Sequence, residues 1–191
     1  EYFPNQQNFL NAFKTLPLDK TKYILFGQDP YPREQSAIGY AFIDGAVESL
    51  WHETNGLTKE VNKATSLRNF MKMLLICEGQ LKDDNTSKEA ISGIQRDVYI
   101  QSIMKLKDNF ETNGILLLNT ALIFTNKEDS KKHVKMWKPF VNSLLNQLKD
   151  ENIKLILFGS MAKDIEKFDI SAQYDKFYCE HPYNVSFITN K

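Results

Sequence analysis

The sequence predicts an α/β fold with three layers, in which helices cover both faces of a central, mostly parallel four-stranded sheet (αβα). Short, continuous apolar segments recur along the 191 residues. Segments with helical periodicity lie between them, and polar residues follow each apolar segment directly. Strands that read as continuous apolar runs are buried on both faces, and strands that alternate with helices form parallel sheets whose two faces are covered.

Four segments are the expected strands. Residues 22–26 (KYILF) are apolar and rich in residues that favour strands, and a glycine follows them. Residues 114–118 (GILLL) and 154–158 (KLILF) have the same character, whereas residues 176–179 (KFYC) are a weaker fourth candidate. Ligands bind beyond the carboxyl ends of parallel strands, so the residues directly after these segments are the first candidates for a site.

Two longer segments carry the expected helices. Apolar residues recur at three- and four-residue spacing over residues 66–77, where Ser66 is the expected N-cap. A second apolar stripe runs along residues 132–150. Residues 82–95 are polar and are expected to form a loop. The chain shows no internal repeat, and we expect a single domain over residues 1–191.

Composition and charge exclude several classes of protein. The 24 basic residues balance the 24 acidic ones, which argues against a strongly basic nucleic-acid coat protein but not against a DNA enzyme, because local patches steer DNA. The two cysteines form no C-x-x-C pair, and the three histidines lack the spacing of a metal site. The longest apolar run is well short of the roughly 20 residues that span a bilayer. We therefore expect no metal, no cofactor and no membrane association.

The residues after the four strands offer a small set of chemical groups. One carboxylate, one amide, one hydroxyl and one imidazole are carried by Asp29, Asn119, Ser160 and His181. A carboxylate beside an imidazole can run acid–base or electrostatic catalysis, and an amide can read a donor–acceptor edge. Tyr31 and Phe42 lie nearby in sequence, and an aromatic face can stack on a planar base. This set favours a nucleobase pocket over a phosphate or metal site.

Competing kinds of site have no motif behind them. The sequence contains no P-loop and no G-x-G-x-x-G segment for binding phosphates. It also lacks the H-x-E and P-C-x-x-C pair of zinc deaminases and the G-x-S-x-G elbow of serine hydrolases.

The motif after the first strand carries a family resemblance. Gly27-Gln28-Asp29-Pro30-Tyr31 resembles the water-activating motif of the main uracil-DNA glycosylase family. Further segments resemble this family in the same order along the chain: Gly39-Tyr40-Ala41-Phe42, Ser66-Leu67-Arg68-Asn69, residues 114–120 (GILLLNT), residues 157–162 (LFGSMA) and His181-Pro182 with Ser186. Together they cover nearly the whole chain, which is therefore identified as a divergent member of the family.

The resemblance implies roles in catalysis. Asp29 would orient the attacking water and stabilise the positive sugar that develops as the bond breaks, as in glycoside hydrolysis. His181 and the backbone at Gln28 would hydrogen-bond uracil O2 as negative charge grows on the leaving base. Asn119 would pair with the uracil edge and disfavour cytosine.

It also implies contacts with the base and with DNA. Phe42 would stack on uracil, and Tyr31 would exclude thymine by a clash with its methyl group. Val185 would take the wedge position that supports the duplex after the base has flipped. Three serines would hold phosphates and position the strand without reading its sequence: Ser66, Ser160 and Ser186.

The chain departs from the family at several positions. Pro32 stands where the family usually has a histidine, and Tyr183 where it has a phosphate-contacting serine. Val185 is smaller than the usual leucine wedge. Residues 62–65 (NKAT) lack the usual proline run before Ser66.

Structural roles stay open at some of these positions. Phe42 and Tyr31 are also candidate core aromatics. Asn119 is a candidate structural amide, although a buried amide must find partners. Ser66 serves equally well as an N-cap, and Val185 as an ordinary loop residue.

The resemblance implies hydrolysis of the N-glycosidic bond of flipped-out uracil in single- or double-stranded DNA, which releases free uracil and leaves an abasic site. The competing hypothesis is a catalytically weak homologue that acts as a DNA-binding or polymerase-associated scaffold. The departures favour this hypothesis, whereas the presence of Asp29, Asn119 and His181 together argues against it.

The expected partner is uracil-containing DNA, with a proteinaceous inhibitor or a replication protein as further candidates. We expect a monomer in the bacterial cytoplasm, or in the nucleus if the source is eukaryotic or viral, and not a secreted protein. The chain starts at Glu1 without an initiator Met, and the family's final segment is missing after Lys191. Terminal segments of the native chain are therefore expected to lie outside this sequence.

Overall fold

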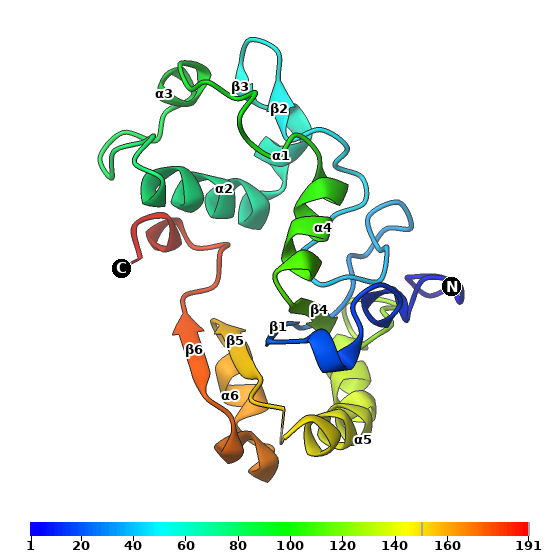
Figure 1. Cartoon of the computed structure of the whole chain (residues 1–191). Coiled ribbons are helices and arrows are strands. Elements are labelled where there is room, and N and C mark those ends of the chain that lie inside the picture. Colours follow the sequence, from blue (N-terminus) through cyan, green and yellow to red (C-terminus); the bar gives the residue numbers. More distant parts are fainter. Residues whose placement is uncertain (150, 191) are drawn as a thin grey trace. The chain divides into compact units, whose positions relative to one another are not determined.

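The computed structural model describes residues 1–149 and 151–190 (Figure 1). The strands are β1 (Tyr23–Gly27), β2 (Trp51–His52), β3 (Gly56–Leu57), β4 (Ile115–Asn119), β5 (Lys154–Phe158) and β6 (Lys176–Cys179). The α-helices are α1 (Lys59–Lys63), α2 (Thr65–Cys77), α3 (Lys88–Ser92), α4 (Ile103–Thr112), α5 (Ser130–Leu148) and α6 (Met161–Ile165). Short 3₁₀ helices are η1 (Asn11–Phe13), η2 (Leu18–Lys20), η3 (Asp169–Gln173) and η4 (Val185–Thr189).

The main sheet has four strands in the order β4-β1-β5-β6. β1 pairs in parallel with β4 on one side, where Gly27 lies opposite Asn119, and with β5 on the other side. Consecutive residues of β1 and of β4 are buried. Because consecutive side chains of a strand point to opposite faces, both faces of the sheet are covered. The α/β prediction, with three layers and a parallel four-stranded sheet, is confirmed.

The described residues group into two compact units. Unit 1 comprises Glu1–Gly45 and Lys107–Tyr178, and it carries the main sheet with α5 and α6. Unit 2 comprises Ala46–Leu106 and the segment from Cys179 onward, and it carries the antiparallel pair β2–β3 with α1, α2, α3 and η4. The single domain expected from the sequence stays a prediction.

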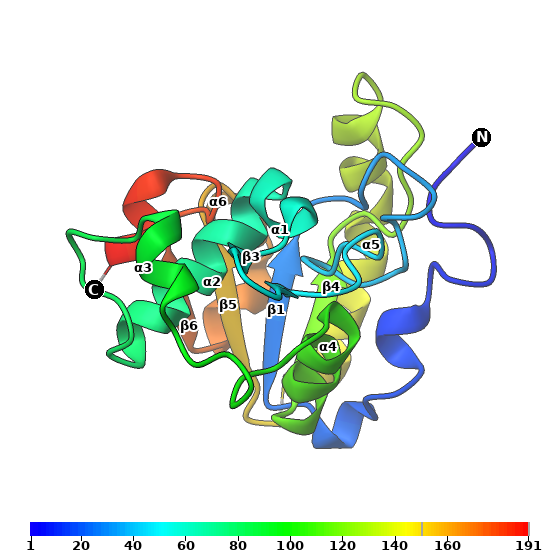
Figure 2. The same cartoon turned by 90° about the horizontal axis from the view of Figure 1, so that it is seen from above.

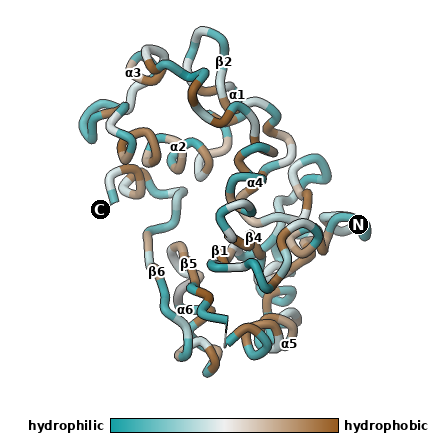
Figure 3. The backbone as a smooth tube through the Cα atoms, in the orientation of Figure 1, coloured by the Kyte–Doolittle hydropathy of each residue, from teal (hydrophilic) through white to brown (hydrophobic). Residues whose placement is uncertain are grey.

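Unit 1 is organised by the apolar stripe of α5. Val141, Leu144, Leu145 and Leu148 are its buried hydrophobic residues, and Figure 3 shows hydrophobic and hydrophilic residues mixed along this helix, as an amphipathic helix requires. The Tyr174 hydroxyl donates to the Leu145 carbonyl at 2.6 Å. Figures 1 and 2 both show β1 and β5 side by side.

Among the described residues, no helix combines the length and the apolar character that a bilayer crossing needs.

Two sequence expectations about local structure were wrong. The N-cap of α2 is Ala64, and Ser66 is the second residue of the helix. The observed N-cap lies two residues before the expected one, because the helix already includes Thr65. Residues 82–95 are not only a loop, since they contain α3, whose N-cap hydroxyl on Ser87 accepts from the Ala90 N–H at 3.2 Å. Ile91 is buried and anchors this short helix, which contacts β3.

Candidate active site

The parallel strands β1 and β4 end next to each other at the same edge of the sheet. Gly27 pairs with Asn119 at the last register position of the two strands. Beyond it, the Thr120 N–H donates to the Gly27 carbonyl at 2.9 Å, and the Ala121 N–H donates to the Gln28 carbonyl at 2.9 Å. The Thr120 hydroxyl donates to the same Gln28 carbonyl at 2.9 Å. Two hydrogen bonds to the Gln28 carbonyl and one to the Gly27 carbonyl therefore hold the backbone directly before Asp29.

The Asn119 side chain lies over the α-carbon of Gly27. A Cβ atom at position 27 would overlap Asn119 Oδ1 and would lie 3.0 Å from the Ala41 Cβ. A glycine is therefore required at this position for the amide to keep its place. Asn119 is buried, yet its side-chain amide makes no hydrogen bond with the residues that the structure describes. The Asn119 amide atoms are not among the fully buried polar atoms that lack a partner, so they reach solvent and are accessible to a ligand. This favours a role in reading a base over a structural role.

Asp29 is linked to the first residue of α5. The buried Ser130 hydroxyl donates to Asp29 Oδ2, and the Gln28 side-chain amide donates to the Ser130 hydroxyl at 3.1 Å. Asp29 is half-buried and, with Pro32, Lys127 and other residues, lines a hollow of about 860 Å³. Sequence reasoning missed Ser130, because a serine at the start of a helix has no local feature that points to a carboxylate 101 residues away.

Phe42 is held in an unusual backbone conformation. Its φ is 63°, in the left-handed region that bulky residues rarely adopt. The preceding Ala41 N–H donates to the Leu117 carbonyl of β4 at 3.1 Å, and the Phe42 ring meets the Phe158 ring edge to face at 5.5 Å. Such strain persists only where the surrounding structure imposes it, and it concentrates at functional sites. The half-buried Phe42 ring thus lies close to β4 and against the last residue of β5, which favours a base-stacking role over that of a plain core aromatic.

Tyr31 and Ser160 also follow strands of unit 1. Burial raises the pKa of the Tyr31 phenol, the Asp44 carboxylate raises it further, and Arg33 acts in the opposite direction. The phenol therefore stays neutral, which suits a steric role better than proton transfer. Ser160 is exposed and follows Gly159, whose φ of 57° turns the chain away from β5.

In unit 2, Asn69 of α2 holds the segment that carries His181. Its buried Nδ2 donates to the Pro182 carbonyl at 2.8 Å and lies 3.4 Å and 3.3 Å from the carbonyls of Tyr183 and Asn184. The same segment continues into η4, which packs on α2. The sequence placed Asn69 in a segment that resembles the family but did not reveal this structural role, because the hydrogen bonds join residues far apart in the chain.

His181 has a defined tautomer. Its Nδ1 accepts from the Tyr183 N–H at 3.1 Å, so the proton of the neutral ring lies on Nε2. Burial lowers the pKa of His181 from its ordinary value of 6.5, which favours this neutral form. The neutral ring therefore carries its proton on Nε2.

The remaining candidates of unit 2 lie at the surface or close to it. Val185, the first residue of η4, is 73% exposed, an unusual environment for a β-branched apolar residue and one that fits a wedge. Ser186 donates to a carboxylate oxygen of Glu180, and Ser66 lies half-buried in the first turn of α2.

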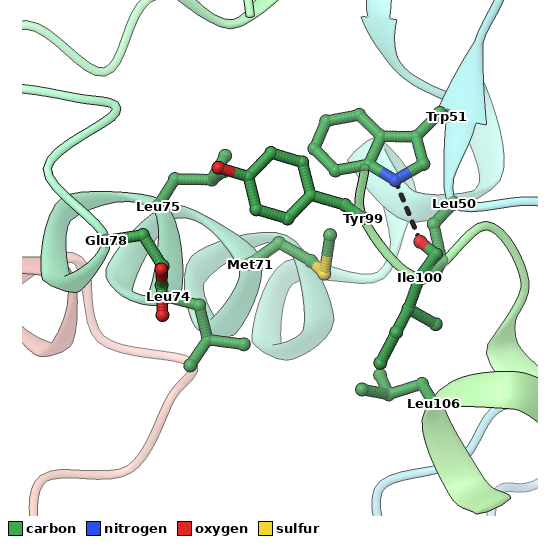
Figure 4. A pocket seen from close by; sticks show the side chains of 9 residues that line it. All are labelled: Leu50, Trp51, Met71, Leu74, Leu75, Glu78, Tyr99, Ile100 and Leu106. Atoms are coloured by element: carbon green, nitrogen blue, oxygen red, sulfur yellow. Dashed lines mark hydrogen bonds between the residues drawn. The ribbon is translucent and has the colours of Figure 1, made fainter. Parts of the chain in front are cut away.

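An apolar pocket in unit 2 has few polar groups that could take part in catalysis or binding. Figure 4 shows the pocket, which is lined by aliphatic and aromatic side chains such as Met71 and Tyr99. The Trp51 indole N–H donates to the Ile100 carbonyl at 2.9 Å and is already satisfied, and Glu78 supplies the only carboxylate of the lining. Within the described ranges, no cluster of three or more His, Cys, Asp or Glu side chains could hold a metal ion.

The candidate residues divide between the two units. Those of unit 1 gather beyond the carboxyl ends of β1, β4 and β5, and they are Gln28, Asp29, Tyr31, Phe42, Asn119 and Ser160. Those of unit 2 lie on α2 and the C-terminal segment, and they are Ser66, His181, Val185 and Ser186. Unit 1 thus combines a positioned carboxylate, a buried amide and an aromatic face.

Comparisons with known proteins point to one family. No family model matches the chain. It is 27% identical over 183 residues to the uracil-DNA glycosylase of Francisella tularensis subsp. tularensis, across 94% of this chain and 69% of that protein. The solved structure of the wild-type UNG from Nitratifractor salsuginis has a TM-score of 0.96 and 46% identity, across 99% of this chain and 76% of that one.

A more distant structure shares the fold. The mimivirus uracil-DNA glycosylase has a TM-score of 0.61 at 20% identity, across 95% of this chain and 56% of that chain, and a variant of the mimivirus UNG was solved in complex with UGI. The 46% identity over almost the whole chain is far above the level at which only the fold is shared. The chain therefore belongs to the uracil-DNA glycosylase family.

Proposed function

We propose that this protein is a DNA-repair glycosylase that hydrolyses the N-glycosidic bond of uracil in single- or double-stranded DNA, releasing free uracil and leaving an abasic site. The observation that carries this proposal is the pairing of two groups at the ends of neighbouring strands. Asp29 follows β1 and Asn119 ends β4, in register at Gly27. A carboxylate for the sugar and an amide for the base thus lie at or just beyond the carboxyl ends of two paired strands.

Asp29 is assigned to the sugar. As the bond to uracil breaks, electrons move to the base and the sugar becomes positive, so a nearby carboxylate lowers the energy of the transition state. Water then attacks the sugar carbon, and Asp29 orients it. The Ser130 hydroxyl occupies Oδ2 of this carboxylate, which leaves Oδ1 for the water.

Base recognition is assigned to the candidate hydrogen-bonding groups and aromatic rings. The Asn119 amide, which has no side-chain partner among the described residues, reads the uracil edge, and Phe42 stacks on the ring. Tyr31, a neutral phenol, excludes the thymine methyl by its bulk. The His181 Nε2–H and the backbone at Gln28 hydrogen-bond uracil O2 as negative charge grows there.

DNA contacts are assigned to exposed or partly exposed residues. The hydroxyls of Ser66, Ser160 and Ser186 contact phosphates, which positions the strand without reading its sequence. Val185, largely exposed, supports the stack that the flipped uracil leaves.

The proposal extends to surroundings and partners. The relatives from Francisella tularensis and Fusobacterium nucleatum are bacterial, so a bacterial cytoplasmic monomer acting on uracil-containing DNA is proposed. The complex of a mimivirus UNG with UGI supports a proteinaceous inhibitor as a candidate partner.

The test is base release from a single-stranded oligonucleotide with one central uracil, scored by alkaline cleavage at the abasic site. Oligonucleotides with thymine or cytosine, a chelator and an Asp29→Asn variant run in parallel. Asp19→Asn is the matched control, because Asp19 is an exposed carboxylate of the same unit. We expect cleavage at uracil alone that survives the chelator, is retained in Asp19→Asn and collapses in Asp29→Asn. A folded wild-type protein that binds the oligonucleotide without cleaving it would instead be a DNA-binding scaffold.

A further inference from the structure

We propose that Ser130 is a positioning residue that holds the Asp29 carboxylate in its working orientation. This inference rests on the proposed function, because it gives Ser130 a role through Asp29. Ser130 lies at the start of α5, and its hydroxyl bridges Gln28 and Asp29.

The direction of the bridge is set by chemistry. An amide nitrogen can only donate, and an ionised carboxylate can only accept. The Gln28 Nε2–H must therefore donate to the Ser130 oxygen, at 3.1 Å, and the single hydroxyl proton of Ser130 must go to Asp29 Oδ2. Each hydrogen bond polarises the next, so the amide strengthens the donor that faces the carboxylate.

No other donor replaces Ser130. Among the described residues, its hydroxyl makes the only hydrogen bond that the Asp29 side chain receives. Pro30, which directly follows Asp29, and Pro32, three residues after it, carry neither a backbone N–H nor a polar side chain. The orientation of this carboxylate thus depends on a single side chain from a distant segment.

The hydroxyl is mounted on a rigid support. Ser130 is itself buried, and the helix that it begins is 19 residues long and packs through an apolar stripe that includes Leu144 and Leu145. Asp29, in contrast, lies in an irregular segment after β1. A hydrogen bond from the helix therefore restricts the orientation of the carboxylate, and it determines which carboxylate oxygen faces the water.

Removal of the hydroxyl should free the carboxylate to rotate. Misplacement of a catalytic group by about 1 Å can cost on the order of 100-fold in rate. We expect Ser130→Ala to lower kcat by about 10- to 100-fold and to change KM by less than about threefold, because the bridge contacts neither the base nor the phosphates. Ser130→Thr keeps the hydroxyl and should recover most of the rate.

The experiment measures kcat, KM and thermal unfolding for the wild type, Ser130→Ala, Ser130→Thr, Asp29→Asn and the double variant of Ser130→Ala with Asp29→Asn. Ser143→Ala is the matched control, because Ser143 is an exposed serine of the same helix. If Ser130→Ala does not fold, Ser130→Cys replaces it, since a thiol of similar size is a weak donor.

The double variant separates positioning from a general structural effect. If Ser130 acts through Asp29, the double variant should be no slower than Asp29→Asn alone. A rate for Ser130→Ala or Ser130→Cys within twofold of the wild type, a failure of Ser130→Thr to recover rate, or an additive loss in the double variant would overturn the inference. None of these outcomes touches the proposed function, which fails only if the folded wild type does not release uracil or if Asp29→Asn stays active.

Discussion

Replacing Asn69 by Ala should release the segment that carries His181. Asn69 is 1% exposed, and its Nδ2 donates to the Pro182 carbonyl at 2.8 Å. The carbonyls of Tyr183 and Asn184 lie 3.4 Å and 3.3 Å from the same nitrogen. Two amide protons thus serve three acceptors, and the Pro182 carbonyl is the one at the shortest distance.

The expected loss of stability follows from the acceptor that is left behind. A buried carbonyl that loses its donor costs about 1–3 kcal/mol, whereas the two less buried carbonyls can turn to water. We expect the free energy of unfolding to fall by about 2 kcal/mol, or about 30-fold in the folding equilibrium. Uracil release should fall as well, because the backbone that orients His181 loses its anchor.

Urea denaturation and single-turnover uracil release provide the two measurements. Asn146→Ala is the matched control, because Asn146 is exposed on α5 and its Nδ2 donates to the Asn142 carbonyl at 2.8 Å. Both substitutions gain the same helix propensity, so the difference between them isolates the buried hydrogen bonds. If Asn69→Ala destabilises the protein no more than Asn146→Ala, these hydrogen bonds do not hold the segment and the reasoning fails.

Three further predictions concern the site. Gly27→Ala should displace the Asn119 amide and lower uracil release by at least about tenfold. Gly93→Ala is the control and should be nearly neutral, because its added Cβ meets ordinary contacts. Equal activities of the two variants would contradict the close approach of Asn119 to Gly27. Phe42→Gly should be more stable to urea than Phe42→Ala by about 1–2 kcal/mol, because only Ala keeps a Cβ at the φ of 63°; the reverse order would show that this backbone relaxes. Burial lowers the pKa of His181 below 6.5, so the unfolded chain takes up a proton first as the pH falls. His181 therefore contributes stability above pH 6.5 that is lost as the pH falls through its lowered pKa. We expect His181→Gln to lose less stability than the wild type between pH 7 and pH 5, measured by urea denaturation at each pH.

Much of the fold was predictable because the strands leave a local pattern. A strand that is buried on both faces needs a continuous apolar run, and such runs placed β5 at its observed bounds and β1 and β4 within one residue. The weaker segment 176–179 also matches the bounds of β6, although the Phe177 and Tyr178 side chains of this strand are exposed. Helix ends were less predictable. The N-cap of α2 and the short helix α3 depend on single side-chain contacts, which the apolar pattern does not report.

The sequence by itself determined the fold class and the family resemblance, because apolar runs and the motif around Asp29 are contiguous in the chain. Only the tertiary structure decided how the candidate groups are held. The link from Ser130 to Asp29 joins residues 101 positions apart, and the link from Asn69 to Pro182 joins residues 113 positions apart. The left-handed backbone of Phe42 is likewise imposed by the strands against which residues 41 and 42 pack. A local pattern records which residues are buried, whereas the partner of a buried polar group depends on which distant segments pack against it.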